Sequence, residues 1–451
     1  MMTSIANSKP NKNAESTLVS ITEKTGVITW LYLMVFSYFI VIPITSVSTI
    51  TTTDLRLYDV VFIFGLIFII LPNFRLLVSY IDKTKWLKTF FIFTAWISFT
   101  LIMVLILSNI QSAIIAAVRI YRFFSYGMVA VVITTFVKKQ KTLYNLLWFF
   151  FILSAIEGWL SFFQYFGYLP NFFPSRWDYY GMMPTGTLGP HHLQLGVVSA
   201  MAVCIGIALL YQEKSLIKKL FIVISIGIMV FASFAVESRT GWVSVSVGAL
   251  FVLINLVKRV SFDLIITLFF IGAGLLGFIF QQQGILLQSV QETYERRFES
   301  KIEKGGIEGL SPTRIKIIQD IPVVITKYPW VLITGAGAQN SGYVLSKQSA
   351  AHNNYLHAFL EGGIIGFVLY IRMVFLIFRQ SFVNYKKAGS KIAKTMLTGF
   401  QGAFLTIMVA NLFNEAFYMQ YASFSLTGQI MALSAICLHY AWVQENTLPI
   451  R

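Results

Sequence analysis

Repeated apolar segments, most of them about as long as a bilayer is thick, dominate the chain. A hydrocarbon core about 30 Å thick needs roughly 20 apolar residues in a helix to cross it. Backbone hydrogen bonds in lipid must be satisfied internally, so such segments are expected to be helices. We therefore predict an all-α polytopic membrane protein with about twelve transmembrane helices. The predicted spans are 27–47, 57–72, 86–107, 112–136, 143–165, 191–211, 217–236, 241–257, 262–280, 356–377, 395–412 and 421–441.

The composition agrees with a bilayer environment and argues against a nucleic-acid partner. Charged residues make up 12% of the chain, against roughly 25% in soluble domains. The net charge of +16 comes largely from lysines in short connectors rather than from one basic surface. Cys204 and Cys437 both lie in apolar spans, which favours small buried side chains over a disulfide or a zinc site.

Basic residues predict the orientation of the chain. They concentrate in alternate connectors, at 75–85, 138–141, 214–219, 258–259 and 386–394, which places these connectors in the cytoplasm. With an even number of spans both termini are then inside. The polar segment 1–25 lacks the apolar core of a cleavable signal peptide and is expected to be a disordered cytoplasmic tail.

The other side carries the longest polar stretch. We divide the rest of the chain into N-terminal membrane helices at 26–280, a periplasmic loop at 281–355 and C-terminal membrane helices at 356–445. A loop of about 70 residues indicates function or a folded cap, and its pattern predicts short helices at 285–298 and 314–324. The halves show no repeat, which disfavours an inverted-repeat transporter, although a transporter or flippase stays an alternative.

Several arginines are candidates for holding an anion. Arg239 lies in a polar break, Val-Glu-Ser-Arg-Thr-Gly-Trp, where it either snorkels to the interface or holds a phosphate or pyrophosphate. Arg119 and Arg122 share one face of the fourth span; they either meet an anion inside the membrane or are interfacial, if the helix begins near Phe123. Arg314 follows Ser-Pro-Thr at a predicted helix start, a position that favours anions.

Histidines supply the remaining candidates. His352 lies between the long loop and an apolar span, and its imidazole titrates near neutral pH, so it could accept a proton from an acceptor hydroxyl. His191 begins the sixth span, where it either packs or contacts substrate. A metal site of His352, His357 and Glu361 is disfavoured, because the spacing of the two histidines does not place both on one helical face.

The stretch His352-Asn353, nine residues, Gly363, two residues, Gly366 resembles the His-[Asn/Ser/Gln]-x9-Gly-x2-[Gly/Thr/Val] pattern of O-antigen ligases. Arg239 followed four residues later by Val243 is similar to the Arg-x3-Leu element of that family, with valine in place of leucine. Ser311 to Arg314 and the segment 335–337 are similar to the loop before the histidine in the wider ligase and polysaccharide-polymerase superfamily. The resemblance covers roughly residues 185–420.

The resemblance implies a bacterial inner-membrane enzyme that takes a glycan from undecaprenyl pyrophosphate and joins it to a hydroxyl of a glycan or glycolipid at the periplasmic face. No metal or nucleotide cofactor is implied. Arg239 and Arg314 would bind the pyrophosphate and stabilise its charge as it leaves. His352 would act as the general base or orient the acceptor, and Asn353 and His357 would support these groups. A polymerase of surface polysaccharide is preferred because that activity occurs in more glycan systems, with a ligase acting on lipid A core as the alternative.

Overall fold

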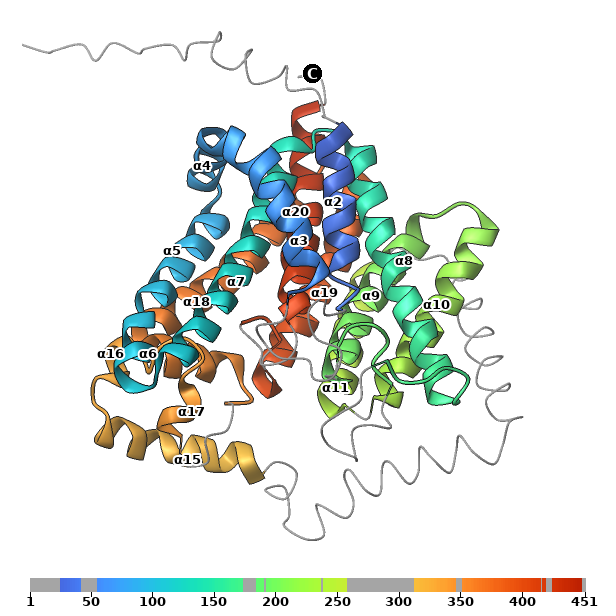
Figure 1. Cartoon of the computed structure of the whole chain (residues 1–451). Helices are drawn as coiled ribbons and strands as arrows, with labels where there is room; N and C mark the ends of the chain where they lie inside the picture. Colours follow the sequence, from blue (N-terminus) through green and yellow to red (C-terminus); the bar gives the residue numbers. More distant parts are fainter. Residues whose placement is uncertain are drawn as a thin grey trace, which may run out of the picture.

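The structure is a computed structural model that describes residues 25–41, 55–172, 184–189, 192–236, 238–257, 312–345, 351–414, 416–418 and 424–447. These residues form a bundle of helices with a small helical cap at one end (Figure 1). The predicted tail, except for its last residue Thr25, and the predicted span 262–280 and helix 285–298 lie outside the described residues.

The described helices follow the predicted order closely. In the first half they are α2 (Thr25–Ser37), α3 (Leu57–Gly65), a π turn (Leu66–Ile70), a 3-10 turn (Leu71–Asn73), α4 (Phe74–Lys83), α5 (Lys85–Phe99), α6 (Leu101–Leu107), α7 (Ile110–Phe136) and α8 (Gln140–Tyr165). The second half contains α9 (His192–Gln212), α10 (Leu216–Ala235), α11 (Arg239–Val257), α15 (Pro312–Lys327), α16 (Val331–Thr334), α17 (Ser341–Val344), α18 (Asn354–Lys387), α19 (Lys391–Phe413) and α20 (Phe424–Thr447).

The all-α polytopic fold is confirmed. Within the part of the chain that the structure describes, nine helices are long and apolar enough to cross a membrane, and two shorter apolar helices, Thr25–Ser37 and Thr240–Leu256, coincide with two further predicted spans. The predicted span 57–72 continues through the π and 3-10 turns to Lys83. The predicted helix 314–324 of the loop corresponds to α15.

The first predicted span is too long at its C-terminal end, because α2 stops at Ser37 rather than at residue 47. A pairing with a distant loop replaces the helix there. The amide of Val41 donates to the carbonyl of Thr187 at 3.0 Å, and the Thr187 hydroxyl donates to the carbonyl of Phe39 at 2.8 Å. Hydropathy alone does not predict this, since the residues involved are as apolar as the helix before them.

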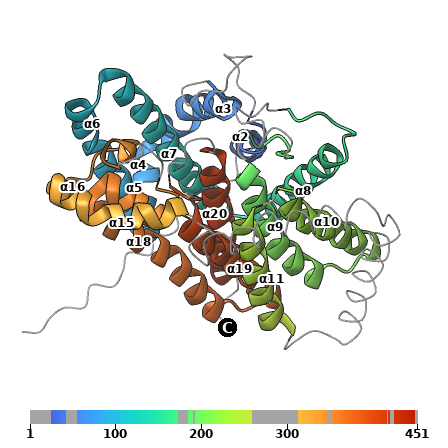
Figure 2. The ribbon, with the colours of Figure 1, turned by 90° about the horizontal axis from the view of Figure 1, so that it is seen from below.

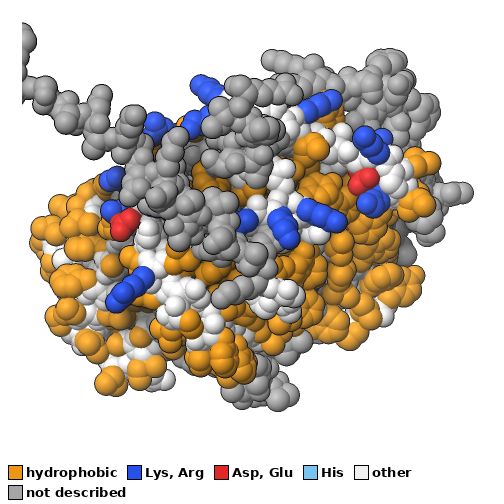
Figure 3. All heavy atoms as spheres, turned by 90° about the horizontal axis from the view of Figure 1, so that it is seen from above, with side chains coloured by type: hydrophobic (Ala, Val, Ile, Leu, Met, Phe, Trp, Pro, Cys, Tyr) orange, Lys and Arg blue, Asp and Glu red, His pale blue; other side chains and the backbone are white. Residues whose placement is uncertain are grey.

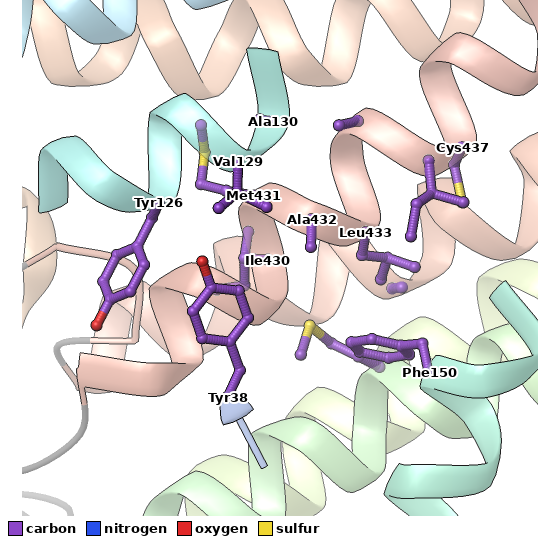
Figure 4. Packing of buried hydrophobic residues seen from close by; sticks show 14 of the residues in the cluster. Tyr38, Tyr126, Val129, Ala130, Phe150, Ile430, Met431, Ala432, Leu433 and Cys437 are labelled. Carbon is purple, nitrogen blue, oxygen red and sulfur yellow. The ribbon is translucent and has the colours of Figure 1, made fainter. Parts of the chain in front are cut away.

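The centre of the bundle is filled by apolar and aromatic side chains. Tyr38 and Tyr126 pack edge to face at 5.4 Å between ring centroids, and α20 contributes Ile430 and Met431 to the same cluster (Figure 4). Cys437 belongs to this core, and both cysteines are buried and free, as the sequence predicts. α9 and α20 are therefore central helices, whereas the Leu57–Lys83 helix is largely exposed.

The two ends of the bundle differ in chemistry. The lysine-bearing turns between α4 and α5, α7 and α8, α9 and α10, and α18 and α19 lie at one end, and lysine and arginine side chains gather on that face (Figure 3). The helices α15 to α17 lie at the opposite end (Figures 1 and 2). The charged turns and the cap are thus separated by the length of the apolar helices.

Candidate functional site

The start of α18 is set by the two residues before it. Asn353 is the N-cap: its side-chain oxygen accepts from the amide of Leu356 at 2.9 Å, which satisfies a donor at the helix start. His352 precedes it in a left-handed conformation, with φ of 49°, a region that His and Asn adopt more readily than most residues. The motif residues His352 and Asn353 are therefore a turn and a cap, and the histidine is half-buried at the helix end.

Gly363, the next motif residue, breaks α18. Its φ of 64° and ψ of −165° are not helical and belong to a region open essentially to glycine alone. The break frees the carbonyls that precede it, and groups from elsewhere take them. The amides of Ala336 and Gly337 donate to Leu360 at 2.7 Å and Glu361 at 3.1 Å, and Trp96 Nε1 donates to Gly362 at 2.7 Å.

The cap is fastened to the first part of α18. Ile317, Val331 and Val344 of the three cap helices form a small hydrophobic cluster with Ala351 and Leu360. The cap is also tied to the bundle, because Ser108 Oγ donates to the side-chain oxygen of Asn340 at 2.7 Å, on the turn after Gly337. Through the amides of Ala336 and Gly337, the short Gly-Ala-Gly turn at 335–337 binds the backbone of α18.

Replacing Gly363 with alanine is expected to destabilise the protein by about 1–3 kcal/mol from backbone strain alone. The added Cβ would also collide with the carbonyl of Ile333. Thermal unfolding in detergent micelles measures the change. Gly26→Ala is the matched control, since nothing lies within 4 Å of a Cβ there. Equal unfolding temperatures for the two variants would contradict this account of the break.

Arg239 is the first residue of α11, which confirms the predicted polar break between two apolar helices. Ser238 caps this helix, accepting from the amide of Gly241 at 3.1 Å. The next residue, Thr240, is buried, and its hydroxyl accepts from Asn414 Nδ2 at 2.8 Å. Asn414 is the C-cap of α19, so the end of α19 is tied to the start of the helix that carries Arg239.

The same end of α19 also holds the start of α18. Asn353 Nδ2 donates to the carbonyl of Leu412 at 3.0 Å, two residues before Asn414. The structure therefore brings the backbones of His352 and Arg239 to a common anchor, although 112 residues separate them in sequence. Figure 2 shows α18, α19 and α11 next to one another at this end.

The start of α9 joins this group. Gly196 of α9 and Gly241 of α11 cross so closely that a Cβ built on Gly196 would lie 3.4 Å from Gly241 Cα. His192 is the first residue of α9, whereas the predicted candidate His191 lies outside the described residues. The N-terminal ends of α9, α11 and α18 thus gather at the end of α19. Helix N-termini carry unpaired amides and a partial positive charge, so such a group suits an anionic ligand.

A buried polar cluster lies one to two turns further along α18. His357 Nε2 is 2.9 Å from Glu361 Oε1, and the Tyr418 hydroxyl donates to Glu361 Oε2 at 3.1 Å; all three side chains are fully buried. Burial raises the pKa of Tyr418 well above its ordinary value, so the hydroxyl stays protonated and can donate. His357 therefore belongs to the interior of the bundle rather than to its surface.

Asn354, which the sequence analysis missed, fixes the segment that carries Tyr418. Its carboxamide oxygen accepts from the amides of Tyr418 at 2.7 Å and Phe417 at 2.9 Å, and its nitrogen donates to the Tyr418 carbonyl at 3.0 Å. Asn354 is also 3.0 Å from the side chain of Asn411. The sequence signal that could have pointed to Asn354 is a polar residue at the start of an apolar span, two positions after His352, because polar groups inside a membrane protein are costly unless they are used.

Arg122 and Arg119 are both buried in α7, with 1% of each residue exposed. Because α7 begins at Ile110, the alternative of a helix starting near Phe123 with interfacial arginines is wrong. Arg122 binds Asp59 of α3 with two bonds, at 2.7 and 3.1 Å, an anion that the sequence analysis did not identify. Arg119 is near enough to Tyr418 for its charge to oppose the effect of burial on that pKa.

Arg314 lies in the first turn of α15, as predicted. It is three residues before Ile317, whose side chain is buried in the cap cluster together with Ala351, the neighbour of His352. The helix that carries Arg314 therefore shares a hydrophobic cluster with the residue directly before His352. Among the described residues no group of three or more His, Cys, Asp or Glu side chains could hold a metal ion.

The described helices define a multi-pass α-helical membrane protein, and the helix ends that carry Arg239, Arg314 and His352 lie at its cap end. Residues 224–371 match the family model described as O-antigen ligase. The matched segment contains Arg239, Arg314 and the whole stretch from His352 to Gly366, so the resemblance to the O-antigen ligase and polymerase superfamily is confirmed. The match supports a glycan-transferring activity. No curated protein matches the chain.

Proposed function

We propose that this chain joins a glycan carried by undecaprenyl pyrophosphate to an acceptor hydroxyl at the periplasmic face of the bacterial inner membrane. The observation that supports this proposal is the common anchor of His352 and Arg239 at the end of α19. That end lies opposite the lysine-bearing turns, which are cytoplasmic by the distribution of basic residues.

In the proposed reaction the acceptor hydroxyl oxygen attacks the anomeric carbon of the carried glycan. The bond between that carbon and the pyrophosphate oxygen breaks, and undecaprenyl pyrophosphate leaves. His352 takes the proton of the hydroxyl. Arg239, Arg314 and the N-terminal ends of α9, α11 and α18 stabilise the negative charge that grows on the pyrophosphate, a task for preorganised cations and dipoles. The reaction then needs neither a metal nor a nucleotide.

The polymerase activity, in which the acceptor is a second lipid-linked repeat of a surface polysaccharide, is the form that we propose. Transfer of the finished glycan to lipid A core is the second candidate, which the description of the matching family as O-antigen ligase favours. Arg122 is given a structural role, since Asp59 occupies its guanidinium. We propose that Arg119 and His357 support the site from inside the bundle, and that Asn353 supports it as the cap of α18.

Reconstitution into liposomes with a single-repeat oligosaccharide on undecaprenyl pyrophosphate tests the function. A polymerase is expected to produce a ladder of longer lipid-linked glycans, and a ligase to modify added lipid A core instead. Heat-denatured protein in the same liposomes is the control. The donor moving across the bilayer with no new glycosidic bond on either acceptor would refute the proposal and favour a flippase.

A further inference from the structure

The start of α11 and the start of α18 are both hydrogen-bonded to the C-terminal end of α19. Asn353 reaches the carbonyl of Leu412, and Asn414 reaches the hydroxyl of Thr240. Leu412 and Asn414 flank Phe413, the last residue of α19. The relative position of Arg239 and His352 therefore depends on two hydrogen bonds donated by asparagine side chains, one accepted by residue 412 and one donated by residue 414.

The bond between Asn414 and Thr240 is built to be rigid. Both residues are buried, with 4% and 5% of their surfaces exposed, and the bond length is 2.8 Å. The backbone N–H of Asn414 also donates to the carbonyl of Ala410 at 2.8 Å, so Asn414 is fixed to its own helix. A buried bond between two fixed elements loses little to competing water.

We propose that Thr240 and Asn414 are positioning residues, which set the place of Arg239 relative to His352 during glycan transfer. This inference rests on the proposed function. Thr240 follows Arg239 directly, so a shift of its hydroxyl moves the first turn of α11. A misplacement of about 1 Å in a reacting constellation can lower a rate about 10²-fold.

The close crossing of α9 and α11 gives this positioning a second support. A Cβ built on Gly241, next to Thr240, would lie 3.3 Å from Gly196 Cα, so the two helices are close and α11 has little room to shift toward α9. The hydrogen bond to Asn414 acts on the side of α11 that faces α19. The first turn of α11 is therefore held by a steric contact on one helix and by a polar contact on another.

Thr240→Val tests the proposal, because valine keeps the shape of threonine and removes the hydroxyl. Thr395→Val is the matched control: the Thr395 hydroxyl accepts from Gln212 Nε2 at 2.7 Å, which ties α19 to α9 at the lysine-bearing end. We expect Thr240→Val to lower kcat about 10–100-fold with little change in KM for the lipid-linked donor. Thr240→Ser is expected to restore kcat, and Thr395→Val to leave it unchanged.

Two further measurements keep the test decisive. If Thr240→Val does not fold, Asn414→Ala removes the same bond from the other partner and is expected to lower kcat in the same way. If both single variants fold, the double variant is expected to be no slower than the slower single variant. Hydrogen exchange at the amides of residues 241–243 is expected to rise in Thr240→Val and not in Thr395→Val.

The inference is overturned if Thr240→Val and Thr395→Val have equal kcat, or if Thr240→Ser fails to restore it. Failure of the proposed function gives a different result. In that case the wild-type protein forms no glycosidic bond, while the exchange measurement still decides whether the hydrogen bond to Asn414 holds the start of α11. Unchanged exchange in Thr240→Val would then overturn the inference by itself.

Discussion

Replacing His352 with asparagine is expected to lower the rate of glycan transfer about 10²–10⁴-fold, the usual contribution of a general base. Asparagine cannot accept the proton as imidazole does, but it tolerates the left-handed backbone that residue 352 adopts. The variant is therefore expected to keep its fold. Initial rates in proteoliposomes and thermal unfolding in detergent check the two parts of this expectation.

Gln339→Asn is the matched control for this variant. Gln339 is the other non-glycine residue with positive φ among the described residues, at 61°, and it lies in the cap between α16 and α17. The control variant is expected to transfer glycan at a rate within about threefold of wild type. A His352→Asn protein that is as active as the Gln339→Asn protein would remove His352 from the reaction.

Replacing Arg239 with alanine is expected to lower kcat about 10²–10³-fold, the loss typical when one group that stabilises a transition-state charge is removed. Arg239→Lys is expected to recover only part of this loss, because an ammonium group cannot bind a phosphate with two parallel bonds. Determination of kcat and KM for the lipid-linked donor separates a transition-state effect from weaker binding.

The stability of Arg239→Ala is expected to change in the opposite direction. A cation in the first turn of a helix is unfavourable by about 0.3–1 kcal/mol, and Arg239 is the first residue of α11. The variant should thus unfold at the same or a higher temperature while its activity falls. Arg379→Ala, an exposed arginine in α18 beyond Gly363, is the control; similar kcat values for both alanine variants would contradict the role of Arg239.

The membrane helices could be predicted from the sequence because the bilayer sets their length and excludes polar residues. The predicted spans coincide with α7, α8, α10 and α19 to within a few residues. The break of α18 at Gly363 was not predicted, since hydropathy continues past it and the Gly362-Gly363 pair by itself does not show that the backbone leaves the helical region there. The break depends on three donors from distant segments, at Ala336, Gly337 and Trp96.

For the candidate site, the sequence predicted on which side of the membrane its residues lie, but not the hydrogen bonds that hold their helices together. Arg239, Arg314 and His352 were placed on one side by counting spans, and the structure brings their helices to that side. The side-chain amides of Asn354 and Asn414 were missed because asparagine at a helix end is usually interpreted as a cap. Asn354 contacts Phe417, 63 residues away in the sequence, and Asn414 contacts Thr240, 174 residues away. No local sequence pattern indicates contacts over such separations.

The broken helix has a consequence for protein engineering. Between His352 and Gly363, the carbonyls of Leu360 and Glu361 accept hydrogen bonds from the cap, and Leu356, Phe359 and Leu360 pack in its cluster, even though this segment is continuous with a membrane helix. A chimera that exchanges caps between relatives would therefore need its junction at Gly363, nine residues inside the apparent transmembrane segment. A junction at the hydropathy boundary would separate the cap from the surface on which it folds.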